Sequence, residues 1–279
     1  MHTGAFLLLF LLAPPTPQAA PVKQESDALR RGTKLYEEKK YDEAVAVYEA
    51  ALAKEPKNPD LLFDLGLALR AKGDIDRARG AVESELAVKP DDAEGHLVLG
   101  EIHEAQGHRI PAVLAYLRFL SLSPDSDRTR GVFDTAERLM AAGLEKDRHD
   151  PDQLVLAPKK GSTSKGAEAA DAETLMAFIA AAAKYSEPDA KPPSEAERTV
   201  KELQFFTGFL SQTSAVEDPF AAKHYVPFFA EMNTSGQVEP FGYLLSASTG
   251  KSGGKEWVDT NGARVTKVKG WARAWRPAR

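Results

Sequence analysis

Three prolines spaced 34 residues apart, Pro56, Pro90 and Pro124, constrain this chain more than any other feature of its sequence. An alanine stands twelve residues before each proline, and a glycine stands twelve residues before each alanine. Columns that share one period of 34 residues indicate a repeated helix–turn–helix unit. The other two columns consist of Ala44, Ala78 and Ala112, and of Gly32, Gly66 and Gly100.

The residue types in these columns suit two antiparallel helices in each repeat. Glycine in the first helix and alanine in the second leave room for the two helices to approach closely. Proline has no amide proton and forces its predecessor out of helical geometry, so it ends the second helix. We therefore divide the array into repeats that start at Glu25, Pro59 and Ala93.

A further amphipathic helix is expected over residues 127–142, directly after the third repeat. Its apolar residues form one helical stripe, and its charged residues face the other way. A stack of repeats needs such a polar-faced helix at its end. The stripe consists of Val132, Phe133, Ala136, Leu139 and Met140.

With these columns, residues 25–143 resemble the tetratricopeptide repeat (TPR) proteins. The resemblance implies an all-α solenoid of three repeats and a capping helix, and it implies protein–protein interaction rather than catalysis. Several positions depart from the family pattern: Arg31 stands where leucine is usual, and Glu85 where a small residue is usual. The fourth position of each repeat, which is often aromatic, holds Ala28, Leu62 and His96.

The resemblance also places ligands in the concave groove lined by the first helices of the repeats. The groove is apolar at Phe63, Leu67 and Leu97 and acidic at Glu101 and Glu104, which suits a peptide or helix with an apolar stripe and a basic end. The alternative is that this groove packs against the chain's own C-terminal half. The candidate partner-binding residues are Tyr36, Phe63, Leu67, Arg70, Leu97, Glu101 and Glu104.

One subclass of the family clamps a C-terminal carboxylate with lysine and asparagine on the first repeat and with basic residues on the third. Here Leu29 and Thr33 stand at the first pair of positions, and Glu94 and Val98 at the second. We therefore do not expect a carboxylate-clamp co-chaperone.

Charge and cysteine content exclude several other classes of protein. The net charge of −5 argues against nucleic-acid binding by the whole chain. With no cysteine, the chain has neither disulfides nor thiolate metal sites nor a cysteine nucleophile.

The N-terminal segment predicts export. Ala5–Ala13 is a run of apolar residues that is too short to span a bilayer and fits the apolar core of a signal peptide over residues 1–20. Ala19 and Ala20 offer small residues for cleavage, although no lysine or arginine precedes the run. We expect a periplasmic or secreted protein; the alternative is an apolar, unstructured N-terminus on a cytosolic one.

The second half of the chain carries no family pattern that we can assign. Residues 144–170 are rich in polar residues and breakers and predict a linker, with a short docked patch at Leu154–Leu156. Residues 171–279 are expected to form a smaller helical domain. Within it we predict helices over 172–186, over 194–211 (Ser194 and Glu197 forming a capping box) and over 262–276. Short β-hairpins over 236–270 are the alternative.

The last part of this domain is basic and holds every tryptophan of the chain. Residues 251–279 contain eight lysines and arginines but only two acids, together with Trp257, Trp271 and Trp275. This composition allows contact with an anionic membrane surface or an envelope polymer. The favoured interpretation is that the tryptophans anchor the domain's own core.

The sequence offers no convincing catalytic, cofactor or metal site. Ser248–Ser252 resembles the end of a phosphate-binding loop, but the required glycine is replaced by Leu245. His96 and His103 lie on one face of a predicted helix but fall in packing columns, and a zinc site needs three or four converging ligands. We therefore expect a non-enzymatic protein that uses no cofactor and binds no metal. The alternative is an unrecognised enzymatic activity in residues 171–279, with the repeats as its adaptor.

Overall fold

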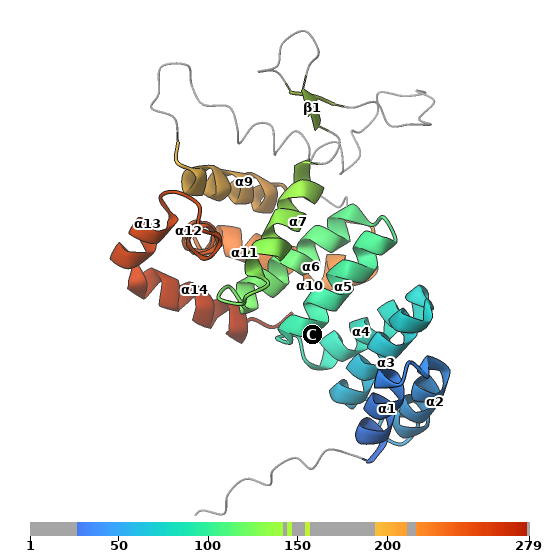
Figure 1. Ribbon diagram of the computed structural model, residues 1–279. Helices are drawn as coiled ribbons and strands as arrows, with labels where there is room; N and C mark the ends of the chain where they lie inside the picture. The colour runs from blue at the N-terminus through green and yellow to red at the C-terminus, as the bar shows by residue number, and fades with distance from the viewer. Residues whose placement is uncertain (1–26, 142–143, 147–153, 157–192, 211–215, 278–279) are drawn as a thin grey trace, which may run out of the picture.

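The computed structural model describes residues 27–141, 144–146, 154–156, 193–210 and 216–277, and helices dominate this part of the chain (Figure 1). The all-α prediction is confirmed, apart from one short antiparallel pair of strands. These are β1 (Leu144–Lys146) and β2 (Leu154–Leu156), with Glu145 opposite Val155. The expected signal peptide and the expected helix over 172–186 lie outside the described residues.

Three helix pairs and a seventh helix form the repeat array, as the 34-residue columns predict (Figure 1). Each second helix ends two to four residues before its proline. The first helices of the repeats contact one another in succession, since α1 contacts α3 and α3 contacts α5. The pairs are α1 (Asp27–Glu37) with α2 (Tyr41–Leu52), α3 (Pro59–Lys72) with α4 (Ile75–Val88), and α5 (Ala93–Ala105) with α6 (Arg109–Leu122), followed by α7 (Thr129–Ala141).

The glycine column marks the closest approach of the two helices in each repeat. A Cβ atom added to Gly66 would lie 2.6 Å from Val82, and one added to Gly100 would lie 2.5 Å from the ring of Tyr116. The alanines of the neighbouring column are fully buried in all three repeats. These helix pairs therefore close on a surface that has no space for a larger side chain.

Capping interactions set where the first helices of the second and third repeats begin. Asn58 accepts backbone N–H groups at the start of α3, and Asp92 does the same at the start of α5. Inside these repeats, Gly73 and Gly107 adopt positive φ angles of 91° and 76° between the paired helices. In the first repeat, Lys39 takes this conformation with a φ of 59°.

The described part of the second half is helical as well. Ser194 and Glu197 form the predicted capping box, with the backbone N–H of Ser194 donating to Glu197 and that of Glu197 donating to Ser194 Oγ. The hairpin alternative over 236–270 is wrong, because helices cover most of this stretch and Asn261 begins a helix instead of a strand turn. The helices are α9 (Glu195–Leu210), α10 (Pro219–His224), α11 (Val226–Thr234), α12 (Val238–Thr249), α13 (Gly254–Thr260) and α14 (Gly262–Ala274).

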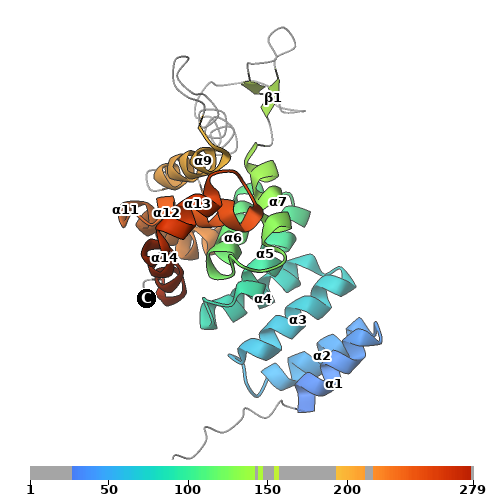
Figure 2. The same cartoon turned by 60° about the vertical axis from the view of Figure 1, so that its left-hand side comes forward.

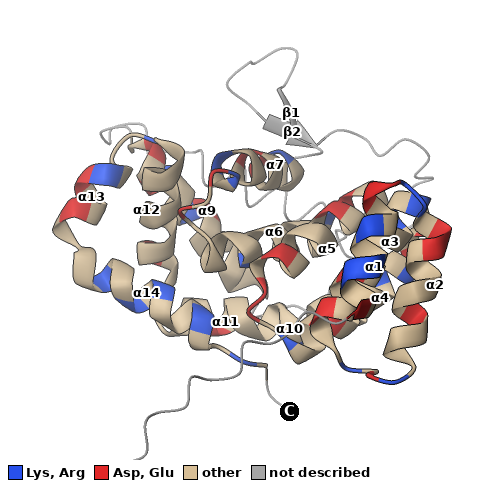
Figure 3. Ribbon diagram, turned by 60° about the horizontal axis from the view of Figure 1, so that its bottom comes forward, with Lys and Arg blue, Asp and Glu red and all other residues tan. Residues whose placement is uncertain are grey.

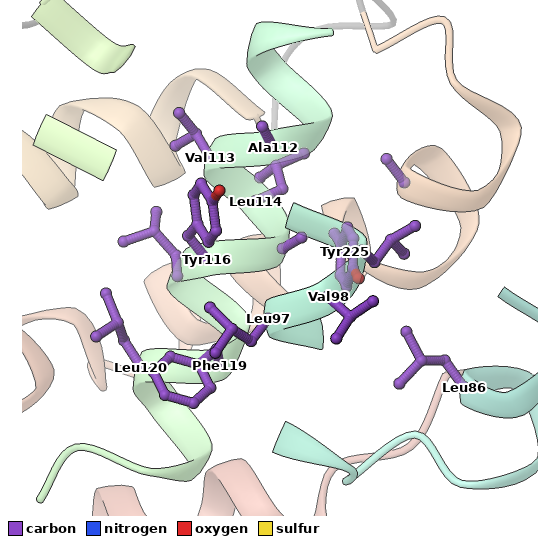
Figure 4. Packing of buried hydrophobic residues seen from close by; sticks show 14 of the residues in the cluster. Leu86, Leu97, Val98, Ala112, Val113, Leu114, Tyr116, Phe119, Leu120 and Tyr225 are labelled. Carbon is purple, nitrogen blue, oxygen red and sulfur yellow. The ribbon is translucent and has the colours of Figure 1, made fainter. Parts of the chain in front are cut away.

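The second half packs on the last repeat and the capping helix. Helix α12 contacts α7, while α10 and α14 contact α6. In Figure 2, helices α9 to α14 gather around α6 and α7, away from α1 and α2. Helix α6 is consequently buried on both faces, from Ala112 through Leu122, and forms the centre of one continuous hydrophobic core (Figure 4).

Candidate functional site

The seven candidate partner-binding residues come from three successive first helices. Tyr36 lies on α1, Phe63, Leu67 and Arg70 on α3, and the remaining three on α5. On α3 and on α5 they recur at intervals of four and three residues, which places them on one face of each helix. We call the surface formed by Tyr36, Phe63, Leu67, Arg70, Leu97, Glu101 and Glu104 the inner face.

The apolar part of the inner face belongs to the first two repeats. Tyr36, Phe63 and Leu67 are partly buried and pack against the core while they keep some exposed surface. Leu97 differs from them, because only 5% of it is exposed and it forms part of the buried cluster drawn in Figure 4. The third repeat therefore offers little apolar surface at this position.

The charged part of the inner face is internally paired. Arg70 of α3 forms an ion pair with Glu101 of α5. Glu104 accepts hydrogen bonds from the Tyr116 hydroxyl at 2.7 Å and from Arg138 of α7 at 2.6 Å. Burial raises the pKa of Glu104, but these two hydrogen bonds outweigh it and hold that pKa below its ordinary value. The expected acidic end is thus largely neutralised by arginines of the array itself.

The four positions that would hold a carboxylate clamp supply no positive charge. Leu29 and Thr33 are partly buried on α1, and Val98 is buried on α5. The carboxylate of Glu94 pairs with Arg128. A partner's C-terminal carboxylate would therefore meet no cation at these positions.

The second half docks on a different surface of the repeats. Its polar contacts with them lie on α4, α6 and α7 and around the start of α5, and within the described ranges none of these contacts uses an inner-face residue. The self-occupied alternative therefore receives no support from the described residues. The pairs that cross between the halves are Arg79–Asp218, Asp91–Arg276, His96–Tyr225, Arg118–Ala272, Asp125–Lys269 and Glu137–Lys251.

Arg118 of α6 is the central residue of this contact. Only 1% of it is exposed, and its guanidinium donates to the carbonyl oxygens of Ala272 at 2.9 Å and Pro90 at 3.3 Å. The guanidinium carbon also lies 4.2 Å from the ring centre of Phe228. Burial lowers the pKa of Arg118 to about 10, so the group stays charged at neutral pH.

Sequence reasoning missed Arg118, although a signal was present. The equivalent positions in the first two repeats are Ala50 and Ser84, and both are exposed. A long charged residue in a column of small exposed residues marks the repeat that carries an additional contact.

His96 is a structural residue of the same contact. Its Nδ1 lies 2.9 Å from the Tyr225 hydroxyl and its Nε2 lies 3.1 Å from the carbonyl oxygen of Pro90. Burial, reinforced by the positive charge of Arg118, lowers the pKa of His96 to about 3. The imidazole is therefore neutral at physiological pH.

The tryptophans of the basic C-terminal segment pack inside the second half. The indole N–H groups of Trp271 and Trp275 both donate to Glu231, and both rings contact Phe228. The basic residues along α13 and α14 are visible in Figure 3. Several of them pair with carboxylates: Lys255 with Asp259, Arg264 with Glu239, Lys269 with Asp125, and Arg276 with Asp91.

The segment that resembles a phosphate-binding loop is the end of a helix. Helix α12 runs to Thr249, and Gly250 closes it in the left-handed conformation with a φ of 77°. Lys251 reaches back to Glu137 of α7. A phosphate-binding loop instead follows a strand and precedes a helix, so this resemblance does not extend to the structure.

An open hollow of about 660 Å³ lies at the other end of the array, between α1 and α2. Ala28, Arg31, Ala46, Val47 and Ala50 are among the residues that line it. None of the inner-face residues lines this hollow. No helix in the described ranges is long and apolar enough to span a membrane.

Comparison with known proteins locates the same region. Residues 35–108 match the tetratricopeptide repeat family. The chain is 30% identical over 115 residues to the mouse protein O-mannosyl-transferase TMTC1, covering 39% of this chain and 12% of that protein. It is 26% identical over 143 residues to the wheat Hsp70-Hsp90 organizing protein, covering 51% of this chain and 22% of that protein.

This chain thus spans less than a quarter of the length of either relative. The columns of 34 residues, the stacked helix pairs and the family match agree with one another. The first half of this chain is a tetratricopeptide repeat array, a fold whose characteristic role is protein–protein interaction.

Proposed function

We propose that this protein is an exported, non-catalytic scaffold whose inner face binds a peptide segment of a partner protein. The observation that supports this most directly is that the second half docks on one surface of the repeats while the inner face lies on another. The described second half docks around α6 and α7, and Tyr36, Phe63 and Leu67 keep exposed surface on the first helices. A rigid receptor of stacked helices loses little entropy on binding, so such a small apolar surface can be effective.

The partner's chemistry follows from the paired charges of this face. Arg70 and Glu101 already neutralise each other, and so do Arg138 and Glu104. We therefore infer that apolar side chains of the partner, seated on Phe63 and Leu67, supply most of the affinity. The basic end expected from the sequence contributes less than the sequence suggested, because it must compete with these two arginines.

The names of the two relatives do not extend this proposal. The aligned region is only 12% of the mannosyl-transferase, so we infer no transferase activity from it. The wheat relative is named for organising Hsp70 and Hsp90, but the clamp positions here hold Leu29, Thr33, Glu94 and Val98. A chaperone C-terminus is therefore not the ligand that we propose.

Selection of peptides from a displayed random library against the whole chain tests the binding surface. The test variant is Phe63→Ala with Leu67→Ala, and the matched control is Val88→Ala, which truncates a side chain that is 44% exposed on α4. We expect selected peptides to carry spaced apolar residues and to bind the test variant at least tenfold more weakly than the control.

A third variant, Ala50→Glu, alters the hollow between α1 and α2. If the test variant still binds the selected peptides and Ala50→Glu does not, the binding surface is this hollow and not the inner face. Circular dichroism of each variant ensures that only folded chains are compared. Export is tested separately by fractionating the native source and sequencing the N-terminus of the protein. Full-length chain with intact Met1 in the cytosol would refute the export proposal.

A further inference from the structure

Three potential metal ligands from different elements meet where the second half joins the repeats. They are Glu83 of α4, His103 of α5 and Asp218, the residue that caps the start of α10. One ligand atom from each residue lies within 4.8 Å of the other two. Two of the residues belong to the repeat array and the third to the second half, so the cluster exists only when the halves are docked.

The imidazole of His103 is buried without a hydrogen-bond partner in the part of the chain that the structure describes, although its ring packs beside that of His108. The residue is 0% exposed, and neither of its ring nitrogens has a hydrogen-bond partner there. A buried polar atom without a partner destabilises the folded state, so such atoms are rare in native proteins.

The carboxylates beside His103 provide the charge that a cation needs. The side chains of Glu83 and Asp218 are 26% and 10% exposed. Asp218 accepts the backbone N–H of Ala221 at 2.8 Å, and this capping bond helps to fix its orientation. One carboxylate oxygen of Glu83 and one of Asp218 lie within 4.8 Å of each other, so the two acids are close together.

Among the described residues, Arg79 is the cation that pairs with these acids. Its guanidinium lies 3.6 Å from Asp218 and 3.9 Å from Glu83, both longer than a hydrogen bond. One arginine against two carboxylates leaves one negative charge. The Arg79 side chain is 30% exposed, so it can turn toward solvent when another cation arrives.

We propose that Glu83, His103 and Asp218 bind a divalent transition-metal ion, with zinc the best match to one imidazole nitrogen and two carboxylate oxygens. Zinc binds such ligands at about 2.1 Å in a tetrahedral arrangement, which separates ligand atoms by about 3.4 Å. Small side-chain rotations bring atoms that lie within 4.8 Å to this spacing. Three protein ligands leave the fourth position for water or for a group from a partner.

The consequence for the molecule is a metal-dependent link between its halves. The ion would tie the start of α10 to α4 and α5, beside the contact that Arg118 makes on α6. A metal site here differs from what we expected from the sequence, which was that the protein binds no metal. That expectation placed His103 in a packing column, which is correct, but the second half supplies Asp218 to the same place.

Isothermal titration of the full-length chain with zinc chloride, after removal of metal with EDTA, tests the proposal. We expect one ion bound per chain and a rise in melting temperature on its addition. Cobalt(II) in place of zinc should give visible absorption bands characteristic of nitrogen and oxygen ligands.

Two variants remove ligands, and a third serves as the control. Asp218→Asn keeps a good helix cap and removes the charge, and His103→Gln removes the imidazole. Both should weaken zinc binding by at least tenfold and abolish the thermal shift. His224→Gln removes a histidine of α10 that is not part of the cluster and should change the affinity less than twofold.

Absence of heat and of cobalt bands in the unmodified chain would overturn the proposal. So would equal zinc binding by the unmodified chain and the Asp218→Asn variant, because the ion would then bind elsewhere. If His103→Gln does not fold, Asp218→Asn decides the outcome alone.

Discussion

Glu85 gives this protein a specific dependence of stability on pH. It lies on α4 with 1% of its surface exposed, and neither carboxylate oxygen has a hydrogen-bond partner within the described ranges. A Cβ atom added to Gly95 of α5 would collide with one of these oxygens, so the carboxyl group is packed directly against the next repeat. Burial, aided by the negative charge of Asp92, raises the pKa of Glu85 to about 8.

The sign of the effect follows from the two pKa values. The folded state keeps the proton up to about pH 8, while the unfolded chain releases it near its ordinary pKa of 4.5. Stability from this group is therefore complete below pH 4.5 and is lost as the pH rises toward 8. Between pH 4.5 and pH 7 the upper bound of the loss is about 3.4 kcal/mol, since each pKa unit corresponds to about 1.4 kcal/mol. The effective dielectric constant of real protein sites, about 20 even where they are buried, reduces our expected value over this pH range to about 2 kcal/mol.

The Glu85→Gln variant isolates this effect because it keeps the shape and removes the titration. Burying the amide has its own cost, but that cost does not vary with pH. We expect the free energy of unfolding of the variant, relative to the unmodified chain, to rise by about 1.6 kcal/mol from pH 5 to pH 7. Urea denaturation followed by circular dichroism at pH 5, 6 and 7 measures this difference.

Glu256→Gln, which removes an exposed carboxylate of α13, is the matched control. If Glu85→Gln behaves like this control, the carboxylate must be ionised and hydrated in the folded state. The argument from burial would then be refuted.

Three further predictions concern stability. Arg118→Ala should lower the free energy of unfolding by about 3 kcal/mol, because it removes a buried guanidinium from two carbonyl oxygens and an aromatic ring. Arg118→Lys should be destabilised as well in chemical denaturation, because an ammonium cannot reproduce the planar contact. Gly100→Ala should lower the free energy of unfolding by about 1 to 3 kcal/mol, because the added methyl group collides with Tyr116. Gly80→Ala, where the methyl group meets open space, should leave this free energy unchanged or raise it by up to about 1 kcal/mol. A smaller loss for Gly100→Ala than for Gly80→Ala in thermal melts would contradict the packing argument. Asn58→Ala should lower the free energy of unfolding by about 1 kcal/mol, because it removes the N-cap of α3. An unchanged midpoint of urea denaturation would show that water replaces the cap.

Much of the array could be derived from its sequence because repeat contacts are local. A residue at a given position of a repeat meets the same neighbours in every repeat, so the glycine, alanine and proline columns predict the helix pairs and their ends. The capping box at Ser194 and the stripe of α7 are likewise short-range patterns. Such features depend on residues a few positions apart, whose relative placement a helix dictates.

The contact between the halves was decided only by tertiary structure. No period links Arg118 to Ala272, or Glu83 and His103 to Asp218, since these residues are far apart in the chain and the second half has no repeat. Packing on both sides of α6 also determined that this helix is buried from Ala112 through Leu122. The sequence determined by itself that the first half would form a repeat array with an inner face. The docking of the second half determined which groups became buried, paired or poised to bind a metal, because burial and charge depend on everything that surrounds a side chain.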